Sequence, residues 1–259
     1  MTQPSVSYAP GRRAGYAEAM FPSIAPSYDT LTRRLTFGWS DIWRRAAIEE
    51  ARLHPGAHAV DLATGTGDLA LLLARAAGTG GRVVGVDVTE AMLDVARAKA
   101  RALLVPDVTG TRGRAPAPGA ATLEFVKMDS ETLPFADGTF DAATLSLGLR
   151  YFDVPRVFGE MRRVLRPGGR IVIVEFGEPA AWWARGGYRL YAYWIMPALG
   201  AIASGRRDVW RLLRFLPNSI HHHHTPGEIV ALLRKAGFDE PACRRLTLGI
   251  GLVFSGTKP

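Results

Sequence analysis

Two neighbouring segments of the chain constrain its fold more than any other feature. The first, from Val60 to Asp68, predicts a buried strand and then a glycine turn that opens a helix. The second, from Val83 to Val88, predicts another buried strand with an acid, Asp87, near its end. This order is typical of a parallel sheet that binds a small cofactor at the carboxyl edge of its strands.

The glycine turn fits a general cofactor-binding pattern. Gly65, Gly67 and Ala70 match G-x-G-x-x-G/A, in which the glycines permit a tight turn and let a ligand approach the backbone at a helix N-terminus. The pattern alone does not identify the ligand. The alternative is an ordinary strand-to-helix turn whose acids only cap the helix.

Acids beside the turn predict which ligand it binds. Asp61 lies near the end of the first strand and Asp68 at the start of the helix, where a dinucleotide would place its pyrophosphate. Carboxylates there would repel phosphate, whereas S-adenosylmethionine has no phosphate and carries a sulfonium and an ammonium group. Asp87, about 20 residues after the turn, is placed to bind a ribose diol. We therefore predict S-adenosylmethionine as the cofactor.

Further patterns extend this unit into a larger sheet. Apolar strand runs alternate with helix-period segments over residues 57–176, which predicts an α/β fold with a parallel sheet covered on both faces. A capped helix is expected from Thr225 to Gly237. The expected strands are Ala59–Leu62, Val83–Val88, Leu123–Lys127, Phe140–Leu147, Arg170–Phe176 and Leu248–Phe254.

Three segments fall outside this alternation. Residues 1–19 have no apolar run that could serve as a signal peptide and are expected to be a disordered tail before one domain over 20–259. Residues 105–121 are rich in glycine and proline and are expected to be a flexible insertion. Residues 177–224, which carry many aromatic side chains, are predicted to hold a cover for the substrate.

Motifs along the chain resemble the ubiquinone/menaquinone-biosynthesis C-methyltransferases, a branch of the class I methyltransferases. Besides the glycine turn they are Ser27-Tyr28-Asp29, Phe37-Gly38, Trp43-Arg44, Asp137 to Asp141, Gly148-Leu149-Arg150, Arg163 to Arg170, Leu216-Pro217, Ser219-Ile220 and Gly256 to Pro259. The resemblance covers residues 20–259. It implies a Rossmann-like class I methyltransferase fold, with a mostly parallel seven-stranded sheet and an antiparallel edge.

The resemblance also implies an activity, which is transfer of a methyl group from S-adenosylmethionine to a ring carbon of a prenylated quinol, such as demethylmenaquinol or a ubiquinol precursor. Asp129 matches the acid that typically holds the adenine amino group in class I methyltransferases; a solvated loop acid is the alternative. The expected cofactor-binding residues are Asp61, Thr64, Gly65, Gly67, Asp87, Val88, Asp129 and Ser130.

Two residues are predicted to serve catalysis. A ring carbon is a poor nucleophile until a neighbouring hydroxyl is ionised, so the enzyme must help to remove a proton and stabilise the oxyanion. Arg150 matches the family arginine and follows a strand at the carboxyl edge; it stays protonated, so we expect it to stabilise the phenolate and orient a water. An arginine that merely pairs with a nearby acid is the alternative. Tyr28 matches a family tyrosine whose hydroxyl could bond the quinol oxygen; a buried aromatic bonded to backbone is its alternative.

The substrate side carries one departure from the family. Tyr151 stands where the family motif has asparagine after the arginine, which removes an amide, adds bulk beside the acceptor and leaves the acceptor's identity open. Tyr191 and Trp194, in the aromatic stretch, are predicted to line a pocket for an apolar tail, and ordinary core packing is the alternative.

Composition limits the other function classes. The formal net charge is +8, but the arginines form no long basic block, which disfavours nucleic acid as a partner. The uncharged stretch 190–204 contains Pro197 and is shorter than the roughly 18 residues of a membrane span. The lone Cys243 excludes an internal disulfide and fits the cytoplasm. Peripheral contact with a membrane and a homodimer both stay open.

No metal is expected to take part in the chemistry. The run from His221 to His224 could trap a transition metal adventitiously, but no complementary ligand set lies near it in the sequence. The rival functions are a methyltransferase of the same fold acting on another phenolic or polyketide metabolite, a nicotinamide-dependent oxidoreductase, and a cofactor-binding protein without catalysis.

Overall fold

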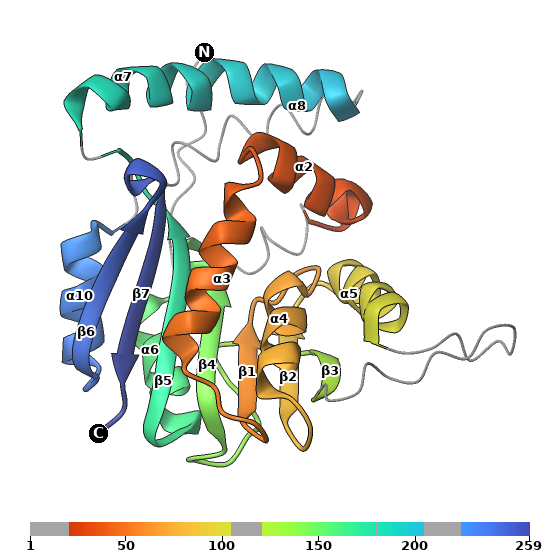
Figure 1. Ribbon diagram of the computed structural model, residues 1–259, viewed down its shortest axis with the longest axis vertical. Coiled ribbons are helices and arrows are strands. Elements are labelled where there is room, and N and C mark those ends of the chain that lie inside the picture. Colours follow the sequence, from red (N-terminus) through yellow and green to blue (C-terminus); the bar gives the residue numbers. More distant parts are fainter. Residues whose placement is uncertain (1–20, 105–120, 180, 205–223) are drawn as a thin grey trace, which may run out of the picture.

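The computed structural model describes residues 21–104, 121–179, 181–204 and 224–259. Their strands form one seven-stranded sheet in the order β3-β2-β1-β4-β5-β7-β6. The first five strands pair in parallel, whereas β7 runs antiparallel to both β5 and β6. Helices cover both faces of the sheet (Figure 1). The predicted fold class, including the antiparallel edge, is therefore confirmed.

The strands are β1 (His58–Leu62), β2 (Arg82–Asp87), β3 (Thr122–Lys127), β4 (Phe140–Ser146), β5 (Leu165–Phe176), β6 (Asp239–Leu246) and β7 (Gly251–Thr257). The helices are η1 (Ala25–Ser27), α2 (Tyr28–Leu35), α3 (Trp39–Ala51), α4 (Asp68–Ala77), α5 (Glu90–Leu104), η2 (Leu149–Tyr151), α6 (Val154–Val164), α7 (Trp182–Leu190), the π-helical turn η3 (Tyr191–Ile195), α8 (Met196–Ser204), α10 (Pro226–Lys235) and η4 (Thr247–Gly249). The predicted tail and nearly all of the predicted insertion at 105–121 lie outside the described residues.

The capped helix near the C-terminus is confirmed as α10. The Thr225 hydroxyl accepts a hydrogen bond from the Glu228 amide, and the Glu228 carboxylate accepts one from the Thr225 amide. This reciprocal capping box satisfies two amides that a helix start would otherwise leave without partners. It explains why the sequence signal at this helix was reliable.

Two strand predictions near the C-terminus were wrong. Strand β6 was missed because it is an edge strand, largely exposed, whose polar sequence shows no apolar alternation. Strand β7 begins at Gly251 rather than Leu248, because the chain turns at η4, where Leu248 has a φ of 61°. Gly251 follows this turn and packs directly against Trp43. A Cβ at position 251 would lie 2.2 Å from the indole nitrogen, so a side chain there would clash.

The hydrophobic core lies in two layers, one on each face of the sheet. One cluster packs β-strand residues such as Val60 and Leu145 against Phe158 of α6 and Leu233 of α10. The other packs Ala59 and its neighbours against α3 and α4. Alternate residues of β1 thus point to opposite layers, as the pleat of a strand requires, and each fully buried large side chain contributes about 1.5 to 3 kcal/mol.

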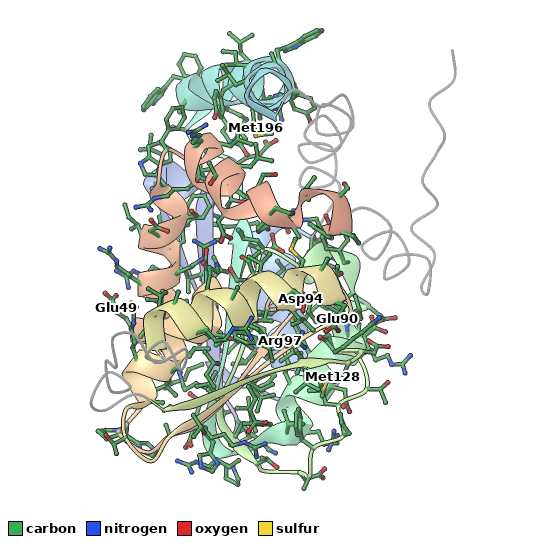
Figure 2. All side chains as sticks on the ribbon, turned by 90° about the vertical axis from the view of Figure 1, so that its right-hand side faces the viewer. Glu49, Glu90, Asp94, Arg97, Met128 and Met196 are labelled. Atoms are coloured by element: carbon green, nitrogen blue, oxygen red, sulfur yellow. The ribbon has the colours of Figure 1, made fainter. Side chains whose placement is uncertain are left out.

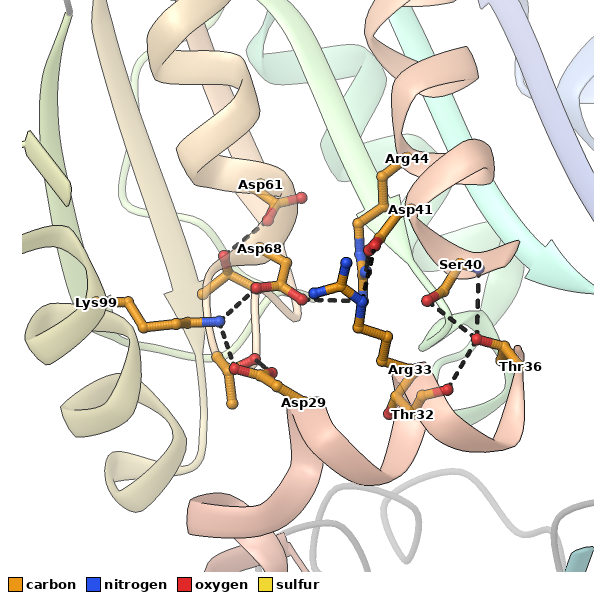
Figure 3. A network of polar contacts seen from close by, with 12 residues as sticks. Asp29, Thr32, Arg33, Thr36, Ser40, Asp41, Arg44, Asp61, Asp68 and Lys99 are labelled. Carbon is orange, nitrogen blue, oxygen red and sulfur yellow. Dashed lines mark hydrogen bonds and ion pairs between the residues drawn. The ribbon is translucent and has the colours of Figure 1, made fainter. Parts of the chain in front are cut away.

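An ionic network ties the N-terminal helices to this core (Figure 3). The Lys99 ammonium of α5 lies between two carboxylates, 2.7 Å from Asp29 of α2 and also in contact with Asp68 of α4. Arg44 of α3 extends the network, 3.2 Å from Asp68 and 3.2 Å from Asp41. Because Asp29 is the second residue of α2, the network fixes the start of that helix at the carboxyl edge of the sheet.

Other ion pairs lie at the surface and contribute less. Arg97 of α5 pairs with Glu90 and Asp94 of the same helix (Figure 2), and Arg82 meets Glu124 at 3.4 Å with both side chains about half exposed. Exposed pairs of this kind typically stabilise a fold by about 0 to 1 kcal/mol.

Replacing Lys99 by methionine should therefore destabilise the fold more than loss of a surface pair. Lys99→Met leaves two partly buried carboxylates beside each other, and we expect a loss of about 1.5 to 3 kcal/mol, the range for hydrogen bonds to charged groups. Urea unfolding of the full chain measures it, with Arg82→Met as the matched surface control. Equal, small losses in the two variants would mean that the network does not hold α2 in place.

Candidate active site

The glycine turn is held by a carboxylate from the neighbouring strand. Asp87, at the end of β2, accepts hydrogen bonds from the Gly65 amide at 2.9 Å and from the Thr89 amide at 2.8 Å. Gly65 and Gly67 have φ values of 54° and 80°, in the left-handed region that favours glycine. Burial raises the pKa of Asp87, although these hydrogen bonds oppose the rise. The acid at the end of β2 therefore holds the glycine turn in shape.

A second acid supports the turn from within the sheet. Asp61 of β1 is fully enclosed, and its two carboxylate oxygens accept hydrogen bonds from the hydroxyls of Thr64, at 2.7 Å, and Thr144, at 2.6 Å. Burial raises the pKa of Asp61 to about 6. Because both oxygens are occupied inside the protein, Asp61 braces the turn from behind.

A cavity of about 480 Å³ opens where the strands β1, β2 and β4 end. Five of the predicted cofactor residues line it, namely Gly65, Asp87, Val88, Asp129 and Ser130. The other three, Asp61, Thr64 and Gly67, are not on its wall. These three residues build the glycine turn beside the cavity, and their part in binding the cofactor stays a prediction. We refer to this space as the polar cavity.

The argument from Asp68 needs correction. Its carboxylate was expected to repel a pyrophosphate at the helix start, but it is paired with Lys99 and Arg44 and does not line the polar cavity. Its negative charge is therefore balanced within the protein. Acids from the ends of β2 and β3, Asp87 and Asp129, line the polar cavity instead.

A second, largely apolar cavity of about 430 Å³ lies beside the first, between α2, α3 and the helices that follow β5. Tyr188, Tyr191 and Met196 line it from above, and Figure 2 shows Met196 on the inner side of α8. The Tyr191 hydroxyl donates to the Leu35 carbonyl at 2.7 Å, which fixes the cover to α2. We refer to this space as the apolar cavity.

Trp194 does not line either cavity. Its side chain is 62% exposed, so the prediction that it lines the tail pocket was wrong. Tyr191 begins a π-helical turn, whose hydrogen bonds span five residues rather than four. Ala192 and Met196, four residues apart, are buried on the inner side of these helices, whereas Trp194 lies between them in the sequence and points to the opposite side.

The two cavities meet at a shared wall formed by Phe21, Tyr28, Leu147 and Tyr151. Leu147, directly after β4, has a φ of 58°, and Ala63, directly after the neighbouring β1, has a φ of 48°. Such left-handed backbone costs non-glycine residues of order 1 to 3 kcal/mol and persists where surrounding structure enforces it. The strain is concentrated where the cavities join.

Arg150 lies behind this shared wall in a buried ion pair. Its guanidinium is 2.7 Å from the Glu175 carboxylate, and the two side chains are 4% and 3% exposed. Burial alone would lower the pKa of Arg150, but Glu175 and the nearby tyrosines outweigh it and raise that pKa. Glu175 also accepts from the Leu149 and Phe176 amides. The expected alternative of an acid partner is thus present, and Arg150 lines the apolar cavity as well.

One nitrogen of Arg150 lacks an internal partner. Among the described residues, its Nε is the single buried side-chain polar atom without a hydrogen bond. A buried donor left without an acceptor costs about 1 to 3 kcal/mol. Such a cost is tolerated where a ligand supplies the missing acceptor.

Tyr28 stands between the two cavities and near two arginines. Burial raises the pKa of its hydroxyl, while the positive charges of Arg44 and Arg150 act in the opposite direction. The ring meets Phe21 edge to face at 6.0 Å between centroids. Since Tyr28 precedes Asp29, the Lys99 network also sets the position of this hydroxyl.

Sequence reasoning missed several residues that build the site. Glu175 was included in the predicted strand Arg170–Phe176 without comment, although a lone acid in an apolar run signals a buried charge that needs a partner. Lys99 and Asp29 gave no such signal, because surface and network ions look alike in sequence. Among the described residues no group of His, Cys, Asp and Glu could hold a metal; His221 to His223 lie outside them.

The polar cavity suits a cationic nucleoside better than a dinucleotide. Its wall carries one basic side chain, Arg156, and four acidic ones, Asp87, Asp129, Glu131 and Asp153. The Gly65 amide donates to Asp87 and the Gly67 amide to the Thr64 carbonyl, so neither is available to a pyrophosphate. Together with the antiparallel edge of the sheet, this acidic lining fits an S-adenosylmethionine-dependent methyltransferase of class I.

Comparison with known proteins identifies the branch of that class. The chain belongs to the ubiE/COQ5 methyltransferase family, whose sequence model matches residues 12–258. It is 39% identical to a demethylmenaquinone methyltransferase of Thermus thermophilus, over 93% of this chain and all of that protein. It is 32% identical to the ubiquinone/menaquinone biosynthesis C-methyltransferase UbiE of Escherichia coli, over 95% of this chain and 92% of that one.

Solved structures support the fold alone. A methyltransferase of Aquifex aeolicus superposes with a TM-score of 0.60 at 17% identity, covering 92% of this chain and 98% of that one. The cyclase SpnF superposes with a TM-score of 0.65 at 16% identity, covering 96% and 98%. Because a cyclase shares the architecture, the fold by itself does not fix the reaction.

The buried Asp61 should leave a signature in the pH dependence of stability. Its pKa rises from 3.8 to about 6 on folding, so the folded state keeps a proton that the unfolded chain releases. The stability contributed by Asp61 is therefore greatest below about pH 4, falls as the pH rises to about 6, and is constant above that.

Comparison of the wild type with Asp61→Asn tests this sign. Going from about pH 7 to about pH 4, the unfolding free energy of the wild type should rise relative to that of Asp61→Asn by on the order of 2 kcal/mol. Urea unfolding at both pH values gives the difference. If the gap between the two proteins does not change with pH, Asp61 titrates as an ordinary exposed carboxyl and the proposed bracing is wrong.

Proposed function

We propose that this protein transfers the methyl group of S-adenosylmethionine to a ring carbon of a prenylated quinol, such as demethylmenaquinol or a ubiquinol precursor. The observation that carries the proposal is the meeting of a polar, acid-lined cavity with an apolar cavity beside a buried arginine. A cofactor bound in the polar cavity and an apolar acceptor bound in the apolar cavity would face each other across Tyr28, Leu147 and Tyr151. The names of the relatives support this choice of acceptor.

The polar cavity has groups that suit each part of the cofactor. When bound, the cofactor supplies an electrophilic methyl group. Asp87 offers its outer lone pairs to a ribose diol while its bonds to Gly65 and Thr89 hold it in place. Asp129 and Ser130, after β3, are the proposed partners of the adenine, with Val88 and Met92 on the apolar wall. The acids around the cavity favour the cationic sulfonium and ammonium groups.

Arg150 is the proposed stabiliser of the ionised acceptor. Its charge persists at any accessible pH, so it acts through the field and through hydrogen bonds rather than as a base. An acceptor oxygen in the apolar cavity would give the buried Nε the partner that it lacks within the described part of the chain. Glu175 holds the other end of the guanidinium and so keeps the planar group oriented.

Two tyrosines are proposed to position the acceptor. Tyr28 would donate from its hydroxyl to a quinol oxygen, and its high pKa keeps it protonated for that purpose. Tyr151 lies on the shared wall, with the Arg150 guanidinium 5.9 Å from its ring centroid. A ring in this place can stack beside an aromatic acceptor, which an asparagine cannot do.

The helices after β5 are the proposed cover. Trp183, Tyr188, Tyr191 and Met196 close the apolar cavity against solvent, and α7 and α8 lie across the carboxyl edge in Figure 1. Exclusion of water strengthens the field of Arg150 at the acceptor oxygen. An apolar lining of this kind also suits a prenyl tail.

Tyr151 favours a second candidate, a methyltransferase for another phenolic or polyketide metabolite. A tyrosine in place of the family's asparagine alters the cavity wall nearest to the proposed acceptor.

Purified protein with S-adenosylmethionine and a reduced short-chain demethylmenaquinone should yield a ring-methylated product by mass spectrometry. In the source organism, loss of the protein should cause a demethylated quinone to accumulate. A normal quinone pool in its absence would instead favour the second candidate.

The cofactor can be tested without the acceptor. Calorimetry should show binding of S-adenosylhomocysteine and none of NAD, because the turn amides are committed within the protein and the cavity is acidic. Asp87→Asn should weaken binding by roughly 10- to 100-fold, since a charge-assisted bond is worth about 1.5 to 3 kcal/mol. Glu124→Gln, on the exposed surface of β3, is the control. Tight binding of NAD would contradict the assignment of S-adenosylmethionine as the cofactor.

Arg150 can be tested through the chemical step. Arg150→Ala should slow methyl transfer by roughly 10² to 10³-fold, as loss of an oxyanion donor does, and leave cofactor affinity nearly intact. Arg150→Lys should recover only part of the rate, because an ammonium lacks the planar donor fork. The deficit should shrink at high pH, where the quinol ionises unaided.

Removing Arg150 alone also leaves Glu175 buried without its partner, which typically costs about 3 to 5 kcal/mol. The double variant Arg150→Met/Glu175→Gln removes both charges and should fold more readily while keeping the same kinetic defect. Wild-type turnover in either variant, or a defect confined to cofactor binding, would assign Arg150 a structural role.

A further inference from the structure

The helices after β5 are apolar on their outer side as well as on the side that faces the cavity. Trp182 is 83% exposed and Trp194 is 62% exposed, although large apolar side chains are normally scattered singly over a protein surface. We define the outer apolar face by the exposed large apolar residues of these helices that line neither cavity, which are Trp182, Leu190, Trp194, Ile195 and Leu199. All five belong to the consecutive elements α7, η3 and α8, so this strip follows one continuous stretch of the chain.

The strip lies at one end of the molecule, beside the apolar cavity. Figure 1 shows α7 and α8 lying across the carboxyl edge of the sheet, with the η4 hairpin turn reaching the same end. Phe37 and Leu248, which are 66% and 63% exposed, are also lining residues of the apolar cavity. Exposed apolar side chains therefore continue from the outer apolar face to the rim of that cavity.

The charged residues within the strip are both arginines. From Pro179 to Ser204 the sequence has no Asp or Glu and two arginines, Arg185 and Arg189, on a chain whose net charge is +8. Arg189 is about half exposed and reaches back to Glu178. Tryptophans accompanied by arginines along one helix face are typical of segments that lie in the interface of a bilayer with anionic lipids.

The strip is not built to span a bilayer. No helix within the described residues is long and apolar enough to cross a membrane. The α7 and α8 helices have nine residues each and are joined end to end through η3. Shallow insertion of one side, parallel to the membrane plane, is the geometry that this length and this distribution of tryptophans allow.

We propose that the outer apolar face docks on an anionic lipid bilayer and lies in its interface. In that position the exposed rim of the apolar cavity meets the lipid, so a prenylated acceptor enters from the bilayer without crossing water. The choice of acceptor rests on the proposed function, whereas docking itself depends only on the surface. A second copy of this chain covering the same strip is the competing occupant.

Vesicle flotation of the full chain, without cofactor or acceptor, tests the docking. The protein should float with vesicles of phosphatidylcholine and phosphatidylglycerol, and less with phosphatidylcholine alone or at high salt. Trp182→Ser/Leu199→Ser should lower partitioning by about tenfold or more, because binding scales with buried apolar area. Neither residue lines a cavity, so the fold and both cavities should stay intact.

Two matched variants separate the contribution of the apolar strip to vesicle binding from that of its arginines. Leu103→Ser removes an exposed leucine of α5, outside the strip, and should float like the wild type. Arg185→Gln/Arg189→Gln should reduce binding to anionic vesicles and leave binding to neutral ones nearly unchanged. Equal flotation of the wild type and Trp182→Ser/Leu199→Ser would overturn the proposal. So would a wild-type dimer, measured by light scattering, that this double variant converts to a monomer without any change in vesicle binding.

Methylation assays keep this test apart from that of the proposed function. With a water-soluble short-chain quinol, wild type and Trp182→Ser/Leu199→Ser should turn over alike; with a long-chain quinol in vesicles, the variant should be slower. If the wild type floats but methylates neither quinol, the acceptor is wrong and docking stands. If both proteins methylate the vesicle-bound quinol equally, the docking proposal fails and the proposed function stands.

Discussion

One ammonium group shared between two carboxylates holds the candidate active site together. Lys99 connects Asp29 at the start of α2 with Asp68 at the start of α4, and Arg44 of α3 joins the same network. The Thr66 hydroxyl of the glycine turn also donates a hydrogen bond to Asp29, and Glu50 of α3 accepts hydrogen bonds from Arg170 and Ser255 of the sheet. Hydrogen bonds to charged groups are directional, whereas apolar contacts are not, so these bonds set the register of α2 and with it the position of Tyr28. Both cavities owe part of their wall to that position.

The candidate site joins two cavities of opposite polarity. Acids at the ends of β2 and β3 make one cavity polar, while aromatic side chains from α2, α7 and η3 make the other apolar. The wall between them is narrow, and the left-handed backbone of Ala63 and Leu147 lies at the strand ends beside it. A Cβ on Gly148 would lie 3.2 Å from that of Ala63, which shows how closely these two strand ends approach. The strained backbone of Ala63 and Leu147 therefore lies where the polar and apolar cavities meet.

The sequence predicted the sheet well and its polar interactions poorly. Buried parallel strands such as β1 and β2 have apolar runs that local patterns reveal, and Asp87 was placed correctly because its position after β2 is fixed by connectivity. The edge strand β6 lacks such a run. The partners of Asp61, Asp68 and Arg150 come from segments far away in the sequence, so no local pattern distinguishes a carboxylate that faces a ligand from one that faces a threonine or a lysine. The prediction for Trp194 was wrong because an aromatic residue in this stretch was assigned to the pocket by composition, whereas its side chain points away from the buried Ala192 and Met196.

The buried pair of Arg150 and Glu175 explains why the proposed chemistry can run in an apolar space. An isolated guanidinium would be expensive to bury, and Glu175 offsets that cost while the amides of Leu149 and Phe176 hold the carboxylate. The pair as a whole is neutral, so it can be enclosed, yet its positive end lies on the wall of the apolar cavity. In that low-dielectric setting an ionised hydroxyl near the guanidinium is stabilised far more than it would be in water. Glu175 is therefore the ion-pair partner that holds the guanidinium in place on this wall.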